Sequence, residues 1–324
     1  MTEVVRIALD AMGGDHAPSE VVKGALLAAA EFPVEIILVG QEDVVRKELA
    51  AAGATPRNIE VFDAREVVTM EDTALAPLRR KRNSSVRVCA NLVAEGRANA
   101  FVSAGNTGAT WTSARAVMGM IEGVSRPALA TVLPSLNGHT LLLDVGANVD
   151  TKPAHLREFA VMGHFYAQML FDIAAPRVGL LSIGEEEGKG NELTKETYRV
   201  LKETGLNFIG NVVLKASEAL GDFVFTTLRQ EMTRSWTRKI GGLLAKSAFE
   251  GLKKRMDYSE YGGAPLLGVK GGCIVCHGRS NAKAIKNAVR VARNFAINRI
   301  DAKIMTKVND LHKREHDSKV LATQ

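Results

Sequence analysis

Four glycine-rich turns carry polar side chains that could bind an anion. They span residues 10–16, 103–108, 144–148 and 182–190. Glycine tolerates positive φ and lets backbone N–H groups approach a ligand, while the neighbouring Asn, Ser, Thr or Asp residues add hydrogen-bonding groups. A glycine after a strand can also simply turn the chain, so each turn taken alone has a plain structural explanation. The four turns together favour an anion-binding site.

Other chemistries have little support in the sequence. It contains no G-x-G-x-x-G or P-loop pattern for a nucleotide and no G-x-S-x-G pattern for a serine nucleophile. The single C-x-x-C, Cys273 to Cys276, has no second pair to complete a zinc site and is typical of a buried strand with small apolar thiols. We therefore expect no metal, no organic cofactor and no covalent acyl-enzyme. Direct attack by bound phosphate, which brings its own nucleophilic oxygen, is the simpler mechanism.

Two of the turns precede predicted helices. The turn Ser103 to Gly108 leads into a helical pattern over 110–121, and a helix N-terminus with free amides is a favourable phosphate site. Lys189 lies between two glycines before a predicted helix over 193–204, where it could stabilise the negative charge that develops during acyl transfer. Asn191 or Thr194 could equally serve only to cap that helix. Spacing alone leaves both interpretations open.

Two further polar segments have both a functional and a structural explanation. In the segment 144–155, His155 would fall in the first turn of a helix, where anion binding or capping is as plausible as proton transfer. The four consecutive cations from Arg79 to Arg82 precede two serines. Such a run is often a solvated loop, but beside a phosphate site it could bind anions or dock an acidic carrier.

Strands and helices alternate along the chain and must position these turns. Predicted strands cover 6–9, 35–39, 59–61, 100–102, 128–133, 140–144, 177–182 and 272–275, and predicted helices include 19–32 and 42–52. The alternation predicts an α/β fold with a parallel sheet, helices on both faces and ligands at the carboxyl ends of the strands. The length allows one large unit or two packed lobes. We expect a single domain over 1–310 and a polar tail over 311–324.

A basic stretch over 222–256 accounts for most of the net charge of +6. Its aliphatic and aromatic residues recur at steps of three or four between Lys and Arg, which predicts a basic amphipathic helix or helix pair. It could be a core or dimer helix, or it could lie on anionic lipid with Trp236, Leu243 and Phe249 as anchors. The sequence contains no run of about 18 apolar residues, the length that is needed to span a bilayer. The first residues do not show the pattern of a signal peptide. We expect a cytoplasmic protein in which any membrane contact would be peripheral.

Six segments in order resemble the signatures of one bacterial family, the acyl-(acyl-carrier-protein):phosphate acyltransferases called PlsX. The segments are 8–18, 103–109, 143–148, 183–192, 261–264 and 277–280. The resemblance implies transfer of a fatty acyl group from acyl carrier protein to inorganic phosphate, giving acyl phosphate for phospholipid synthesis. It also implies a Rossmann-like α/β/α fold similar to isocitrate dehydrogenases and phosphotransacetylases, with a protruding helical tip, and no cofactor. A homodimer, peripheral membrane contact through the tip and a downstream glycerol-phosphate acyltransferase partner are further implications.

The resemblance and the turns together give the candidate site residues. The expected catalytic residues are Lys189, Asn191 and Asn106, and the expected carrier-docking residues are Arg79, Arg80 and Lys81. Those expected to bind substrate or phosphate are Asp10, Gly13, Gly14, His16, Ser103, Gly105, Thr107, Gly108, Asp144, Asn148 and His155.

One departure from the family pattern stands out. After Asn211 the chain passes directly to Val212, where family members usually have a further strand ending in an Asp-Gly turn and a second Gly-Asn. The join therefore resembles an internal deletion across a short repeat. An unpaired sheet edge and a lost wall of the site would impair activity.

Two alternative functions remain open at this point, and a third is disfavoured. The first is a phosphotransacetylase-like transferase that uses acyl-coenzyme A, and the second is a catalytically impaired membrane-surface scaffold. Nucleic-acid binding is disfavoured, because the basic stretch interleaves aliphatics in helical phase without the usual stacking aromatics.

Overall fold

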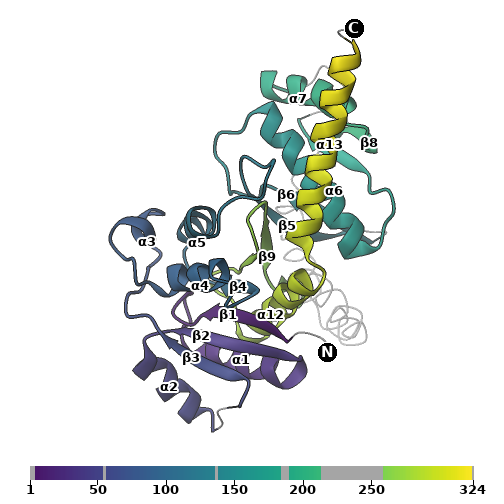
Figure 1. Ribbon diagram of the computed structural model, residues 1–324. Coiled ribbons are helices and arrows are strands. Elements are labelled where there is room, and N and C mark those ends of the chain that lie inside the picture. The colour runs from purple at the N-terminus through teal and green to yellow at the C-terminus, as the bar shows by residue number, and fades with distance from the viewer. Residues whose placement is uncertain (1–3, 54–55, 136–137, 184–189, 213–257, 323–324) are drawn as a thin grey trace, which may run out of the picture. The chain divides into compact units, whose positions relative to one another are not determined.

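The computed structural model of the protein describes residues 4–53, 56–135, 138–183, 190–212 and 258–322 (Figure 1). The chain forms two compact units. The first comprises residues 1–151, 155–176 and 258–324, and the second comprises 152–154 and 177–257. The expected single domain over 1–310 therefore contains two compact units. The predicted amphipathic stretch with Trp236, Leu243 and Phe249 lies outside the described residues, as does Lys189.

An eight-stranded sheet forms the centre of the first unit. Its strand order is β3-β2-β1-β4-β10-β9-β5-β6. The first five strands in this order pair in parallel, as the alternating pattern predicted. They are β3 (Ile59–Asp63), β2 (Val34–Gly40), β1 (Val5–Asp10), β4 (Ala100–Ser103) and β10 (Gly272–Val275). Their carboxyl ends consequently lie along one edge of the sheet.

The other three strands pair antiparallel, which the sequence analysis did not anticipate. β9 (Ala264–Leu267) runs antiparallel to β10 and β5, and β5 (Ala128–Ser135) forms a hairpin with β6 (Gly138–Leu143). Only two residues connect β5 to β6, too few for the helical crossover that parallel pairing requires. The predicted strand over 140–144 exists, but its direction makes the sheet mixed.

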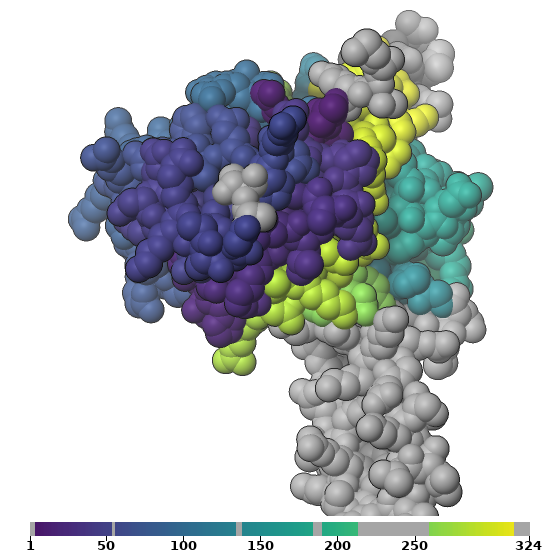
Figure 2. Space-filling view, turned by 90° about the horizontal axis from the view of Figure 1, so that it is seen from below, coloured from purple at the N-terminus to yellow at the C-terminus, as the bar shows by residue number. Residues whose placement is uncertain are grey.

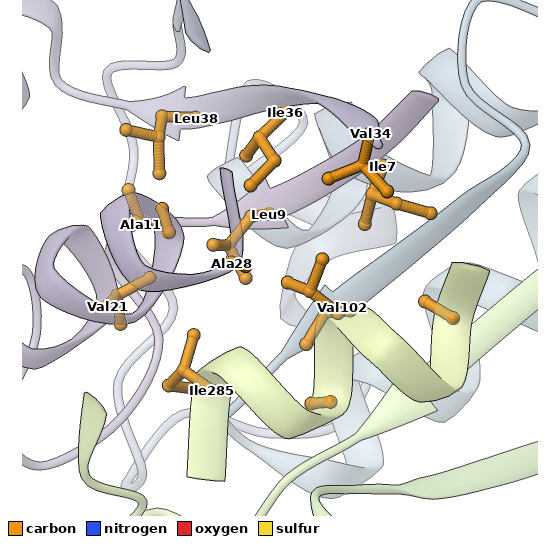
Figure 3. Close-up of a cluster of buried hydrophobic side chains, with 14 of the residues drawn as sticks. Ile7, Leu9, Ala11, Val21, Ala28, Val34, Ile36, Leu38, Val102 and Ile285 are labelled. Carbon is orange, nitrogen blue, oxygen red and sulfur yellow. The ribbon is translucent and has the colours of Figure 1, made fainter. Parts of the chain in front are cut away.

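Helices cover both faces of the parallel strands because successive side chains of a strand point to opposite faces. Ile7 and Leu9 of β1 pack with α1 (Ser19–Glu31) and α12 (Ala282–Ile297). Figure 3 shows this cluster, with Ile7, Leu9 and Ile285 pointing into the same apolar layer. Segments of α1 and α12 also lie side by side on the face seen in Figure 2. Ala8, between Ile7 and Leu9, packs with α4 (Ser85–Ala94) on the opposite face.

The remaining helices of the first unit are α2 (Glu42–Ala51), α3 (Ala76–Arg79), α5 (Thr107–Ser113), α6 (Pro153–Phe171), α11 (Tyr258–Tyr261) and α13 (Ile300–Ala322). α13 is helical as far as Ala322, where the sequence predicted a polar tail from residue 311. It is docked through Val308, which is 2% exposed and lies against Gly123. The ammonium group of Lys307 lies over the Phe165 ring. This packing stabilises α13, although its polar sequence does not by itself predict a helix.

The second unit is small in its described part. β7 (Val178–Leu181) and β8 (Phe208–Val212) pair in parallel, and α7 (Glu192–Lys202) connects them. Leu201 of α7 is buried and the Tyr198 ring packs edge-on against Phe208. Among the described residues of the whole chain, no helix is long and apolar enough to cross a membrane.

Candidate functional site

Asp10, the last residue of β1, is a buried carboxylate at the carboxyl edge of the sheet. Its side chain is 2% exposed. The Ser103 hydroxyl donates to Asp10 Oδ2 at 2.7 Å, the Met12 amide donates to Oδ1 at 3.2 Å, and Ser85 and the Gly13 amide are further partners. Burial raises the pKa of the Asp10 carboxyl above its ordinary value, and these hydrogen bonds oppose the rise. Asp10 is thus committed to holding the turn that follows it.

Three turns meet where β1, β4 and β10 end. A Cβ on Gly13 would lie 2.8 Å from the Gly105 amide nitrogen and 2.6 Å from Asp10 Oδ2, so only glycine allows this approach. Gly14 has φ of +111°, and the amide of Asp15 donates to Gly278 O at 2.8 Å. The predicted turns after β1 and β4 therefore lie together, joined by the turn after β10. His16, predicted to bind substrate, lies exposed on the first of these turns.

Asn106 hydrogen-bonds to the start of α5 and to the segment 69–72. Its side-chain oxygen accepts from the Ala109 amide at 3.0 Å and so caps α5. Its amide nitrogen donates to the carbonyl oxygens of Thr69, Met70 and Asp72 at 3.3, 3.3 and 3.0 Å. Asn106 thus ties the segment 69–72 to the start of α5. Its predicted catalytic role stays a prediction.

The predicted helix over 110–121 differs in both position and type. α5 begins at Thr107, because Asn106 caps it, and from Ala114 to Met118 the chain forms a π-helix. Gly108, in the first turn, lies against the segment that precedes α4: a Cβ on Gly108 would be 2.9 Å from the Cβ of Ala74. Of the other predicted phosphate residues on this turn, Thr107 is exposed and Gly105 is buried.

Residues 64–84, which we call the strap, connect β3 to α4 and carry the predicted docking cations. Lys81 points inward: its ammonium donates to Val67 O at 2.7 Å and to Asp72 Oδ2 at 2.5 Å. Lys81 and its hydrogen bonds lower the pKa of Asp72 below its ordinary value. Arg79 and Arg80 are exposed. The strap therefore presents Arg79 and Arg80 outward, while Lys81 holds it in shape.

The turn around Asp144 is a self-contained structure. Asp144 has φ of +62°, and its Oδ1 accepts from the amide nitrogen of the Asn148 side chain at 2.8 Å. Asn148 also donates to Pro127 O at 3.0 Å. His155 is the third residue of α6, in the first turn as predicted. These contacts hold the turn, whereas Asn148 Oδ1 is buried and has no hydrogen-bond partner among the described residues. The binding roles predicted for Asp144, Asn148 and His155 stay predictions.

A pocket in the second unit lies at the end of β7 and the start of α7. It is lined by Leu181, Ser182, Ile183, Gly190, Asn191 and Thr194. Asn191 Oδ1 accepts from the Thr194 amide at 3.0 Å, which confirms the predicted capping role. Gly190 has φ of +103°, and a Cβ there would collide with Thr194 Oγ1. Ser182 Oγ is buried and has no hydrogen-bond partner among the described residues.

The three cysteines are buried, as expected for structural thiols. Burial raises the pKa of Cys276 to about 12 and also raises that of Cys89 and Cys273. Thiols held in the neutral form are poor nucleophiles. Among the described residues, no group of three potential metal ligands comes together.

Two features of the site escaped the sequence analysis. Ser85 contacts Asp10, but in the sequence it is only one of two serines before a helix. Gly278 meets the first turn through its carbonyl oxygen, and its segment 277–280 had been noted only as a family signature. The sequence signal that could have identified the segment 277–280 is a glycine-containing turn directly after a strand, as also occurs after β1 and β4.

Comparison with known proteins identifies close relatives. A family model described as "Fatty acid synthesis protein" matches residues 5–212 and 204–303. A phosphate acyltransferase of Pelotomaculum thermopropionicum is 48% identical over 329 positions, covering 95% of this chain and 96% of the relative. A phosphate acyltransferase of Pelobacter propionicus is 47% identical over 330 positions, covering 95% of each.

Solved structures share the fold at low sequence identity. A phosphotransacetylase from Streptococcus pyogenes superposes with a TM-score of 0.62 and 18% identity, covering 92% of this chain and 95% of that one. A branched-chain phosphotransacylase from Enterococcus faecalis gives a TM-score of 0.51 at 17% identity, covering 90% and 99%. These likenesses show the Rossmann-like α/β fold that the sequence predicted.

Proposed function

The chain belongs to the phosphate acyltransferase family, and on that basis we propose that it transfers a fatty acyl group from acyl carrier protein to inorganic phosphate. Family membership supports this proposal: relatives nearly half identical over 95% of the chain are phosphate acyltransferases. Acyl transfer to phosphate follows from the family. The identity of the thiol carrier is the proposed part.

The reaction requires no nucleophile from the protein. An oxygen of phosphate attacks the thioester carbonyl, a tetrahedral oxyanion forms, and the C–S bond breaks to give acyl phosphate and the carrier thiol, which takes up a proton. We assign the stabilisation of the oxyanion to Lys189 and to the pocket containing Ser182 and Asn191, because donors aimed at a developing charge give the largest rate effect. The turns anchored by Asp10 and Asn106 provide the backbone amides proposed to hold phosphate.

Charge on the strap supports a protein carrier rather than coenzyme A. Arg79 and Arg80 are exposed on one short segment, and guanidinium groups suit the carboxylates of an acidic protein. We no longer include Lys81 among the residues proposed to dock the carrier, because its ammonium group pairs with Asp72. The proposed docking surface is therefore smaller than the sequence indicated.

An assay of acyl phosphate formation tests the donor. Purified protein is incubated with phosphate and either acyl carrier protein thioester or acyl-coenzyme A, and acyl phosphate is trapped as the hydroxamate. We expect product and free carrier only with the protein thioester. Product from coenzyme A alone would support the phosphotransacetylase-like alternative and overturn the proposed donor.

Charge reversal on the strap tests the docking surface. Arg79→Glu with Arg80→Glu is expected to raise KM for the carrier thioester about tenfold, with little change in kcat, because rim charges act mainly on encounter. Lys47→Glu with Arg57→Glu makes the same change of charge at exposed positions away from the strap. An equal effect of both pairs would show that net charge, not this surface, matters.

Membrane association, a homodimer and contact with a glycerol-phosphate acyltransferase are proposed from the family resemblance, in a cytoplasmic protein. The basic stretch 222–256 supports contact with anionic lipid. Flotation with anionic liposomes tests it: Trp236→Glu with Leu243→Glu is expected to abolish binding. Unchanged flotation of that variant would remove the membrane assignment.

A further inference from the structure

A short segment of this chain corresponds to two places in its family. The family model matches residues 5–212 and again residues 204–303, so residues 204–212 are matched twice. A single chain segment aligns with two successive parts of a family only if those parts resemble each other and the chain retains one of them. The duplicated match therefore places a deletion within or beside residues 204–212.

The lengths of the alignments show how many residues of the relatives have no counterpart in this chain. The alignment with the Pelotomaculum relative has 329 positions but includes 95% of this chain, which is about 308 of 324 residues. About 20 positions of the relative thus have no counterpart here. The alignments with the Pelobacter and Trichlorobacter relatives, with 330 and 328 positions over 95% and 94% of the chain, give nearly the same difference. A segment of this size holds one strand and its connection.

The geometry of β8 is irregular at the same place. Val178 pairs with Phe208, but the next residue, Gly179, pairs with Gly210, so Ile209 is left as an extra residue in the ladder. Gly210 has φ of +99°, outside the range of an ordinary strand. A Cβ on Gly179 would approach the Val212 side chain closely, so the pairing depends on glycine in β7 as well.

The described part of the second unit leaves apolar side chains in water. Leu181, Ile183, Ile209 and Val212, on or next to β7 and β8, are 47%, 82%, 50% and 38% exposed. Parallel strands normally lie within larger sheets that are covered on both faces. In the first unit the core strands β1, β4 and β10 are almost wholly buried. Among the described residues, the two-stranded sheet is thus less buried than the sheet of the first unit.

We infer that β8 is a fusion of two strands that are separate in the relatives, with a segment of about 20 residues lost between Asn211 and Val212. The fusion reaches the candidate pocket directly, because the carbonyl oxygen of Val212 accepts from the amide of Ser182, which lines it, at 3.0 Å. Displacement of catalytic groups by about 1 Å lowers rates on the order of 100-fold. We therefore expect this junction to lower the rate of acyl transfer.

Reinsertion of the segment tests the inference. One variant receives, between Asn211 and Val212, the corresponding residues of the Pelotomaculum relative. A second receives a Gly/Ser segment of equal length at the same position. We expect the first to protect the amides of β7 and β8 from hydrogen exchange and to raise acyl phosphate formation on the order of 100-fold over the parent chain. The Gly/Ser variant should do neither, because it adds length without a strand.

The two measurements separate this inference from the proposed function, on which the activity readout rests. The Pelotomaculum enzyme, assayed in parallel, shows that the substrates are competent. If the restored variant gains amide protection but forms no acyl phosphate, the inference stands and the proposed function fails. Protection of β7 and β8 in the parent equal to that in the restored variant would overturn the inference, and so would equal acyl phosphate formation by the two when both form product.

Discussion

Asp10, which the sequence places among the residues expected to bind substrate or phosphate, also has a structural role in the fold. An acidic residue at the end of a parallel strand is a natural candidate for binding or proton transfer. Its carboxylate is instead surrounded by Ser85, Ser103 and two amides of its own turn. The hydrogen bonds offset part of the cost of burying the charge. They also fix the two turns that meet at Gly13 and Gly105.

The raised pKa of Asp10 gives a pH-dependent stability. A carboxyl whose pKa is higher in the folded than in the unfolded protein binds its proton more tightly when folded, so its contribution to stability is full below about 3.8 and declines as pH rises through the folded pKa. We therefore expect the free energy of unfolding of the parent, relative to Asp10→Asn, to fall between pH 4 and 7. Urea unfolding of both proteins across this range measures it. A difference that stays constant or rises with pH would show that the hydrogen bonds outweigh burial.

Asn106 and Asn191 cap helices in the same way but differ in their other contacts. Asn106→Ala removes a cap and leaves three carbonyl oxygens of the strap without their donor, so we expect a loss of about 2–3 kcal/mol in unfolding free energy. Asn191→Ala removes an exposed cap and should cost about 1 kcal/mol. Chemical denaturation of both variants tests the ranking. Equal losses would mean that the strap contacts contribute nothing.

At the scale of elements, the strap depends on an internal cation. Lys81→Met removes the ammonium that joins Val67 and Asp72, and we expect a loss of about 1 kcal/mol, because the pair is partly exposed. Hydrogen exchange of the amides at 66–72 should rise. Arg79→Met, the exposed neighbour, should change neither quantity by more than about 0.5 kcal/mol. Exchange that rises equally in both variants would contradict the role given to Lys81.

The strands were the most predictable elements. Buried β-branched runs bounded by glycine turns located β1, β2, β4 and β10 to within one or two residues, because both signals depend on local sequence. The direction of β5 and β6 was not predicted, since pairing is a tertiary property. The helical end of α13 was missed for the same reason: its polar sequence gains support only from docking of residues such as Val308.

The candidate site was predictable in its position but not in the duties of its residues. Parallel topology alone brings the turns after β1 and β4 to one edge. Whether Asn106 faces a ligand or a backbone carbonyl depends on where the strap folds, and the strap has no periodic pattern. The same holds for Lys81, whose partner Asp72 is nine positions away in a loop. The sequence thus indicates which turns share the sheet edge, but not which partners their side chains contact.

At the scale of the whole molecule, the two units should differ in stability. The first unit buries strands on both faces, whereas the described part of the second has a two-stranded sheet with exposed apolar side chains. We expect urea to unfold the second unit first, so that amides of β7 and β8 exchange well before those of β1 and β4. Hydrogen exchange at increasing urea concentration measures this order. A single cooperative loss of protection over all four strands would contradict it.

The positions of the cysteines make that experiment possible by a second route. All three thiols belong to the first unit: Cys89 lies in α4, Cys273 lies within β10 and Cys276 follows that strand. All three are buried in the folded protein. A maleimide or other alkylating reagent would consequently react only when the first unit opens. The folded chain would also accept a single engineered surface cysteine for a fluorescent or spin label without competition from its own thiols. The rate of thiol alkylation would thus report the opening of the first unit alone, because the second unit contains no cysteine.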